Sequence, residues 1–356
     1  MAQDGDNQDQ VRHIFRWDLD KTYLQTDFDS WRDLLKTALQ TPEDKVNVPG
    51  ADALLRQLTK RTPEGRAVLT FISGSPEQMR RTIEMKFALD GVKPDTFILK
   101  PQLNYLLRGK IRAIRGQVGY KLDALLRVRT MAPLANEALF GDDAEQDAFI
   151  YSLYADTVAE IISPDELWSL LDLARVYPDT RDLIVERAKS ARKKDTVRRI
   201  FINLDRQSSP GRFLPFGPRV IPISNYFQAA LVLFEDGVLS GSGLMCMAFD
   251  MVTDTSYGIA ELANSYQDLG RRGIVDRGLV EMLEEDRDTL LELEDVPPDF
   301  VQRLLSRLMA LAPMSRLAER DWDGPPDYAA ILRADHGLRE AVEEEPKKRK
   351  RFFGRR

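Results

Sequence analysis

The sequence is poor in the residues that build disulfides, cysteine and histidine metal clusters, and histidine-activated nucleophiles. Among 356 residues it has one cysteine, Cys246, and two histidines, His13 and His336. A single cysteine excludes an internal disulfide, and its apolar surroundings, "SGLMCMAFDM", indicate a core residue. Neither histidine lies near a serine or cysteine motif, so nucleophilic catalysis that depends on histidine is disfavoured.

Long apolar runs and a targeting segment are also missing. No run reaches the roughly eighteen residues of a membrane span, and the polar start "MAQDGDNQDQ" is unlike a signal peptide. We therefore expect a soluble, cytoplasmic protein. With 43% hydrophobic residues, the chain can bury a large core in one large domain or two ordinary ones.

Charge divides the chain into an acidic body and a basic end. The formal net charge is -6, and the last ten residues, "KKRKRFFGRR", carry seven positive charges, which leaves -6 - 7 = -13 on the rest. We expect residues 341–356 to be a disordered tail, first acidic and then basic. Its basic part, 347–356, suits contact with an anionic membrane surface, and the alternatives are a solubilising end, a nuclear address or a weak nucleic-acid contact.

Apolar patterning alternates between strands and helices along the first two thirds of the chain. Strand-like runs are "HIFRW", "AVLTFIS", "TFILK", "EALFGD" and "RRIFIN", and helix-like spacing occurs in "FDSWRDLLKTAL", "ADALLRQLTKR", "YKLDALLRVRTM" and "AFIYSLYADTVAEII". After "AVLTFIS", Ser75 and Pro76 predict a capped helix start. The alternation predicts an α/β fold, a Rossmann-like parallel sheet flanked by helices.

The stretch "RWDLDKT" raises the first functional question. Asp18 follows a strand-like run, and Asp20 and Thr22 come two and four residues later. Ligands collect at the carboxyl ends of strands in open α/β sheets, which favours a catalytic pair. Asp-rich turns are common, however, so the stretch alone also fits a simple turn.

Three further polar signals follow predicted strands or lie on the helices between them. They are Ser73 with Gly74 in "FISGS", Lys121 in "GYKLDAL", and the acidic run "FGDDAEQD", which contains Asp142, Asp143 and Asp147. In their order and settings, these signals and "DLDKT" resemble the haloacid dehalogenase superfamily of phosphotransferases. Within it, "FISGSPEQM", "TFILK" and above all "FGDDAEQDAFIY" resemble the catalytic domain of the actin-patch-associated phosphatidate phosphatases, over roughly residues 11–240.

The resemblance implies a role for each of these side chains. Asp18 would attack the phosphoryl group and carry it as an aspartyl phosphate, and Asp20 would act as general acid and base. Ser73 and Lys121 would bind the transferring group, whose charge needs donors and cations placed beforehand. Magnesium prefers carboxylate and carbonyl oxygens, and the ligands implied are Asp18, Asp20 through its backbone carbonyl, and Asp142, with Asp143 and Asp147 as direct or neighbouring partners.

The chain departs from that family in three respects. Two helices are expected within an insertion at about 164–194, Asp143 stands where relatives often have serine, and a helical region at 241–340 has no counterpart. The two segments that usually house a cap hold little material for a lid, which suits a headgroup presented by a bilayer. In "SSPGRFLPFGPRV", Arg212 and Arg219 lie beside phenylalanines and, with Thr22 and Gly74, are candidate substrate contacts; a plain linker is the alternative.

These observations favour a magnesium-dependent phosphatidate phosphatase that acts on a phospholipid. A phosphomonoesterase for a soluble sugar, inositol or nucleic-acid phosphate is the first alternative, and a non-enzymatic membrane scaffold is the second. The intact set of polar residues disfavours the scaffold. No nucleic-acid partner is expected, and the sequence does not determine the oligomeric state.

Overall fold

A six-stranded sheet forms the centre of the protein. The computed structural model describes residues 10–25, 46–62, 65–100, 110–255, 257–313 and 324–335, with backbone alone at 110–116. The strands are β1 (Val11–Trp17), β2 (Arg66–Pro76), β3 (Thr96–Lys100), β4 (Asn136–Asp142), β5 (Val197–Asn203) and β6 (Val220–Ile223). All neighbours pair in parallel, in the order β3-β2-β1-β4-β5-β6. The predicted α/β, Rossmann-like class is confirmed.

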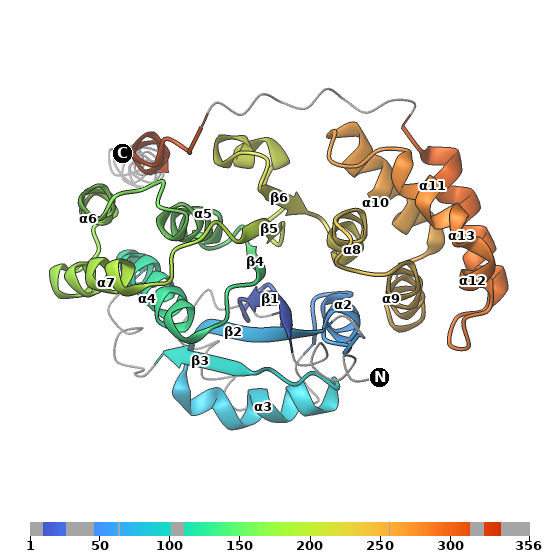
Figure 1. The fold of residues 1–356 in the computed structure, drawn as a ribbon, viewed down its shortest axis with the longest axis horizontal. Helices are drawn as coiled ribbons and strands as arrows, with labels where there is room; N and C mark the ends of the chain where they lie inside the picture. Colours follow the sequence, from blue (N-terminus) through green and yellow to red (C-terminus); the bar gives the residue numbers. More distant parts are fainter. Residues whose placement is uncertain are drawn as a thin grey trace, which may run out of the picture.

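Helices cover both faces of this sheet (Figure 1). One face packs on α4 (Lys110–Met131) and α5 (Asp147–Val158), and outside these helices lie α6 (Pro164–Leu173) and α7 (Pro178–Ser190). The other packs on α2 (Ala51–Leu58), α3 (Arg80–Leu89), α8 (Tyr226–Glu235) and α9 (Gly241–Asp254), and beyond them lie α10 (Ile259–Arg271), α11 (Gly278–Glu285), α12 (Arg287–Leu291) and α13 (Pro298–Leu311). Short 3-10 helices, η2 (Glu77–Met79) and η4 (Pro210–Phe216), complete the elements.

The strands are apolar on both sides because both faces are covered. On β5, the side chain of Phe201 enters the core beneath α8 and α9, whereas Ile200 and Ile202 enter the core beneath α4 and α5. Successive side chains of a strand point to opposite faces, so a continuous apolar run is needed to fill two cores. The uninterrupted run in "RRIFIN" is therefore a consequence of the layered architecture.

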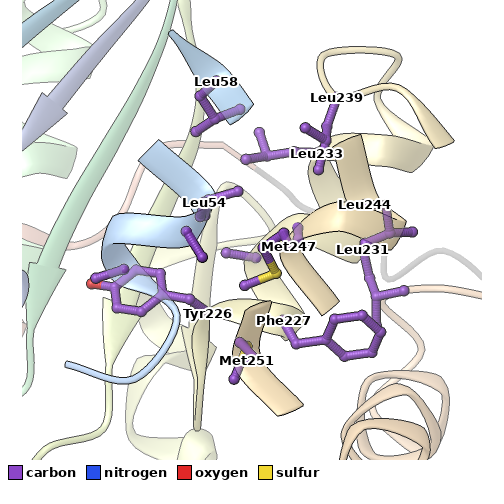
Figure 2. Packing of buried hydrophobic residues seen from close by; sticks show 14 of the residues in the cluster. Leu54, Leu58, Tyr226, Phe227, Leu231, Leu233, Leu239, Leu244, Met247 and Met251 are labelled. Atoms are coloured by element: carbon purple, nitrogen blue, oxygen red, sulfur yellow. The ribbon is translucent and has the colours of Figure 1, made fainter. Parts of the chain in front are cut away.

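The core beneath α8 and α9 joins the sheet to the carboxyl-terminal helices. Figure 2 shows Leu54 and Leu58 of α2 facing α8 and α9, which contribute Leu233, Leu244 and Met247. Gly50, just before α2, has φ 82°, and a Cβ there would lie 2.6 Å from the sulfur of Met251. A glycine is required at that position both for its left-handed backbone and for the close approach of α9.

Most predicted elements are present, including two helices within the insertion and helices that continue as far as residue 335. The predicted helix at 28–39 and the tail at 341–356 lie outside the described residues. The short strand β6 was missed because Pro222 interrupts its pattern, and an edge strand tolerates proline. The predicted serine cap at Ser75 is wrong, since Pro76 occupies the cap position of η2 and makes no side-chain capping bond.

Two features of the architecture bear on function. The strand order reverses at β1, because β2 and β3 lie on one side of it and β4 to β6 on the other. Crevices outside the carboxyl ends of strands form at such a reversal. Within the described ranges, none of the helices combines the length and apolar character that crossing a membrane requires.

Candidate active site

Two aspartates meet at the reversal of strand order. Asp18 directly follows β1, and Asp142 ends the neighbouring β4. The backbone N–H of Asp18 donates to the carbonyl of Phe140 at 2.9 Å, which fixes the end of β1 against β4. Both aspartates are 1% exposed, yet neither oxygen of the Asp18 carboxylate accepts a hydrogen bond from the described residues, and nor does Oδ2 of Asp142. Buried carboxylate oxygens that accept no hydrogen bond are costly unless a ligand completes them.

Lys121 enters the same space from α4. Its Nζ lies 2.5 Å from Asp147, 2.6 Å from Glu145 and 3.3 Å from Asp18. Burial on its own lowers the pKa of Lys121, but these three carboxylates outweigh it and hold the pKa well above the usual range of lysine. The ammonium is therefore charged and is surrounded by acids.

The turn after β4 is built to place Asp147. Oδ1 of Asp142 accepts bonds from the N–H groups of Ala144 and Glu145, at 2.5 and 3.0 Å, and so shapes the turn. At the start of α5, Oδ2 of Asp147 accepts the N–H of Asp142 at 3.2 Å. A Cβ on Gly141 would lie 2.4 Å from that oxygen, so this close approach requires glycine.

Asp20 is held by a second group of residues, at the end of β2. Its Oδ2 accepts hydrogen bonds from the hydroxyls of Ser73 at 3.0 Å and Ser75 at 2.7 Å. The Oγ of Ser73 also accepts the N–H of Ser75 at 2.9 Å. Asp20 therefore has a fixed side chain beside, but distinct from, the carboxylates around Lys121.

The carboxylates around Lys121 form a cluster suited to a cation. Asp18, Asp142, Glu145 and Asp147 each offer an oxygen, and these oxygens lie within 4.8 Å of one another. Burial, with the neighbouring carboxylates, raises the pKa of Asp18 and Asp142 well above the usual range, and burial raises the pKa of Asp147 to about 6. Four carboxylates face one ammonium, so a hard cation with oxygen ligands fits both the donor set and the charge.

Asp143 does not join this cluster. Its two oxygens accept the backbone N–H groups of Arg206 and Ser208, at 2.8 and 3.0 Å, so that it holds the loop after β5. Thr22 is fully buried, and its carbonyl accepts the hydroxyl of Tyr226 at 2.6 Å. Gly74 lies between Ser73 and Ser75 with room for a Cβ, since the nearest atom, on Gln117, would be 3.7 Å away.

The two candidate arginines lie outside the cluster. Arg212 is exposed on η4 and reaches Ser208 at 3.4 Å. Arg219 immediately precedes β6, so it lies at the opposite edge of the sheet from Asp18. There it bonds Asp156, near the far end of α5, at 2.9 Å. The structure does not bring Arg219 to the site, because the chain runs from the carboxyl end of β5 to the amino end of the parallel strand β6 before it reaches Arg219.

The structure adds to the site three residues that were not predicted to take part in it. Glu145 contacts Lys121, Ser75 holds Asp20, and Gly141 makes room for Asp147. Glu145 lies inside the acidic run "GDDAEQD", and its position in that run is the sequence feature that could have indicated its place in the site. Nothing local distinguishes Ser75 from a helix cap, which is the role that the sequence predicted for it.

Comparison with known families identifies the segment that carries this site. Residues 17–163 match the family described as phosphatidate phosphatase APP1, catalytic domain. No curated protein and no solved structure matches the chain. All residues of the cluster, together with Asp20, Ser73 and Lys121, fall within the matched segment. Residues 17–163 are therefore similar to the phosphatidate phosphatase APP1 catalytic-domain family, and the enzyme class expected from the sequence is the class of that family, a phosphoric monoester hydrolase.

Proposed function

We propose that this site hydrolyses phosphatidate to diacylglycerol and phosphate through a covalent intermediate on Asp18. The observation that carries the proposal is a buried carboxylate, Asp18, whose oxygens accept no hydrogen bond from the described residues and whose Oδ1 lies 3.3 Å from the ammonium of Lys121. A carboxylate in that setting can attack phosphorus and divide one difficult displacement into two easier ones. The lipid substrate is supported by the family description.

In the first step an oxygen of Asp18 bonds to phosphorus while the bond from phosphorus to the alcohol oxygen breaks. Lys121 and Ser73 bind the phosphoryl oxygens and offset their charge. In the described state the hydroxyl of Ser73 donates to Asp20. That hydroxyl must turn to the phosphate when substrate binds, and Ser75 can keep Asp20 in place because it bonds the same oxygen.

Asp20 supplies the proton that the leaving alkoxide needs. It then takes a proton from the water that attacks the aspartyl phosphate, which releases inorganic phosphate and restores the Asp18 carboxylate. The hydroxyl bonds from two serines fix the direction of its carboxyl group. A glycerol alkoxide is a poor leaving group, so the reaction depends strongly on this acid.

We propose magnesium as the metal at the acidic cluster. Asp18, Asp142 and Asp147 would hold it with the backbone carbonyl of Asp20, and Glu145 is a further carboxylate within reach. When bound, a magnesium ion would offset the repulsion between an anionic nucleophile and an anionic phosphate. The oxygens of Asp18 and Asp142 that accept no hydrogen bond from the described residues fit this assignment, whereas Asp143 is occupied by the loop after β5.

The test compares phosphate release from phosphatidate vesicles with release from a panel of soluble phosphomonoesters, with and without Mg²⁺. Asp18→Asn keeps the volume of the side chain and removes the nucleophile, so we expect no turnover and an unchanged circular dichroism spectrum. Turnover by Asp18→Asn at a rate near that of the native enzyme would refute the covalent mechanism. Release from a soluble ester alone would refute the lipid substrate and leave the chemistry standing.

We also propose that the basic tail, residues 347–356, brings the enzyme to anionic membranes. Each basic residue near such a surface contributes about 1 kcal/mol, and the attraction decays within about 10 Å at ordinary ionic strength. Deleting residues 346–356 should weaken co-sedimentation with phosphatidate-containing vesicles and make the remaining binding less sensitive to salt. Equal binding by both forms would contradict the proposal.

A further inference from the structure

A second lysine ends a strand at the same edge of the sheet as the acidic cluster. Lys100 is the last residue of β3, and its Cα pairs with that of Pro76 on β2. Ser75, next to Pro76 in the chain, bonds Asp20. Neighbouring strands lie about 4.8 Å apart, so Lys100 lies one strand spacing from the residues that hold Asp20.

The side chain of Lys100 points to the face of the sheet that α4 covers. Ile98, two residues earlier, packs in the core beneath α4 and α5, and alternate side chains of a strand share a face. The ammonium of Lys100 lies 5.6 Å from the centre of the ring of Tyr120, on α4. Lys121, the next residue of α4, brings its own ammonium to the acidic cluster. Lys100 therefore approaches the site from the same face as Lys121.

The close neighbour of the Lys100 ammonium is an aromatic ring rather than an acid. Within the described residues, its nitrogen takes part in no ion pair and no hydrogen bond. Lys21, at the same edge of the sheet, differs because Asp205 engages it at 3.3 Å. A cation–π contact at a half-buried position holds an ammonium more weakly than a buried ion pair does, so Lys100 remains available to an anion.

Glu145 links Lys100 electrostatically to the acidic cluster. Burial lowers the pKa of Lys100, and the carboxylate of Glu145 opposes that shift. The same carboxylate lies 2.6 Å from the ammonium of Lys121. Gln117 of α4 also donates to Glu145, and its Nε2 would lie 3.7 Å from a Cβ on Gly74 of β2. Lys100 therefore stands beside the part of the site where β2 and the acidic turn approach α4.

The charges of the site favour a further cation. The acidic cluster has four carboxylates, which face Lys121. A bound magnesium ion would add two positive charges, and the cluster would still be negative when all its carboxylates are ionised. A phosphomonoester then brings about 1.5 to 2 negative charges of its own at neutral pH. Another positive group within reach of that phosphate favours its binding.

We propose that Lys100 is a second substrate-binding cation: its ammonium bonds a phosphate oxygen of the substrate, beside the oxygens that Lys121 and Ser73 bind. This inference rests on the proposed function, since it concerns the same phosphomonoester. The ammonium leaves the face of Tyr120 when the phosphate enters and returns to it when inorganic phosphate departs. Because Lys100 favours the substrate and the transition state alike, its loss should raise KM and leave kcat nearly unchanged.

Binding of inorganic phosphate to the full chain tests the proposal without turnover. A phosphorus NMR titration with saturating Mg²⁺ gives the Kd of the native chain and of Lys100→Met, which keeps most of the side-chain length and removes the charge. We expect Lys100→Met to raise that Kd by about tenfold or more, which corresponds to the loss of one charge-assisted hydrogen bond. Lys100→Arg keeps the charge and should retain most of the affinity.

Lys93→Met is the matched control. Lys93 is exposed and precedes β3, so it lies at the opposite end of the same strand from Lys100. This variant removes the same charge from the chain, and its affinity for phosphate should equal that of the native protein. An equal loss of affinity in Lys93→Met and Lys100→Met would reduce the effect to net charge and would overturn the proposal.

The affinity for magnesium, measured by calorimetry without phosphate, separates substrate binding from support of the acidic cluster. Removing a cation beside Glu145 should leave Mg²⁺ binding unchanged or tighter. A Lys100→Met chain that binds both Mg²⁺ and phosphate more weakly would make Lys100 a support of the cluster and would overturn the proposal. A folded Lys100→Met chain with the native Kd for phosphate would overturn it as well.

Kinetics on a short-chain, water-soluble phosphatidate distinguish failure of this inference from failure of the proposed function. KM should rise in Lys100→Met together with the Kd for phosphate. A native chain that binds phosphate through Lys100 but releases none from phosphatidate would refute the lipid substrate and leave the role of Lys100 standing. A Lys100→Met chain that hydrolyses phosphatidate with the native KM would overturn the inference and leave the proposed function standing.

Discussion

Replacing Gly141 by alanine should disable the site with little effect on the fold. The new Cβ would lie 2.4 Å from Oδ2, 2.5 Å from Cβ and 2.8 Å from Cγ of Asp147. Non-bonded heavy atoms prefer about 3.5 Å or more, so Asp147 must retreat by about 1 Å. That movement breaks its bonds to Lys121 and to the N–H of Asp142, which are 2.5 and 3.2 Å long.

A shift of about 1 Å in a catalytic group costs about a hundredfold in rate, and forcing a methyl group into a packed interior costs about 1 to 3 kcal/mol. We therefore expect kcat to fall at least a hundredfold, together with a higher Mg²⁺ requirement. Urea unfolding should show the modest loss of stability. The assay is phosphate release from phosphatidate vesicles across a Mg²⁺ series.

Gly241→Ala provides a matched control. Gly241 is also buried, but the nearest atoms to a Cβ there, on Leu283 and Leu290, lie at an ordinary 3.5 Å. If Gly141→Ala unfolds the protein, Asp147→Asn removes the charge without adding volume and should lose activity in a folded chain. Native activity and an unchanged Mg²⁺ titration for Gly141→Ala would refute the role assigned to the contact between Gly141 and Asp147.

The remaining predictions concern the acid, the metal ligands and the core. Asp20→Asn should lower the rate on alkyl phosphates by about 10² to 10⁴, with a smaller loss on an aryl phosphate, whose leaving group needs no acid. Asp142→Ala should raise the Mg²⁺ concentration for half-maximal activity and Asp143→Ala should not; the opposite order would exchange their roles. Glu137→Gln should lower the free energy of unfolding, measured with urea, by about 3 to 5 kcal/mol at neutral pH. The loss of stability on the acid side should become shallower, and a variant whose stability depends on pH as that of the native protein does would contradict this.

The surroundings of Glu137 determine the direction in which its contribution to stability changes with pH. Burial on its own raises the pKa of this carboxyl, but the guanidinium groups of Arg16 and Arg129 outweigh it and hold the pKa below its usual value. A group whose pKa is lower in the folded state stabilises the protein above its unfolded pKa, near 4.5. That stability is lost as the pH falls through the folded value, so native stability should decline on the acid side.

The sequence predicted the residues of the site better than their contacts. Asp18, Asp142 and Ser73 were expected together because the carboxyl ends of parallel strands share one edge, and the structure brings them to that edge. Local patterns could not assign Ser75, because a serine before a proline fits a helix cap equally well. The packing of residues 324–335 on α5 was equally hard to predict, since no periodicity in those residues indicates which distant helix they contact.

The insertion at 164–194 shows how an element outside the matched family segment can still serve the site. Its second helix, α7, and the turn before it pack closely on α4, because a Cβ on Gly119 would lie 3.0 Å from Thr180 of α7 and 3.0 Å from Val176 of the turn. An ion pair of 2.5 Å joins Arg187 to Asp123. These contacts stand on either side of Lys121 along α4, so α7 supports the helix that carries the lysine.

The insertion therefore has a structural role that does not require it to cover the substrate. Lys121 is surrounded by Asp18, Glu145 and Asp147, and drawing an ammonium into a buried acidic cluster requires that α4 be held firmly in register with β1 and β4. A cap would have to lie over the carboxyl edge of the sheet, whereas α6 and α7 lie outside α4 and α5, on the side of those helices away from the sheet (Figure 1). The insertion can therefore stabilise the lysine while the edge that carries the acidic cluster is left to the substrate.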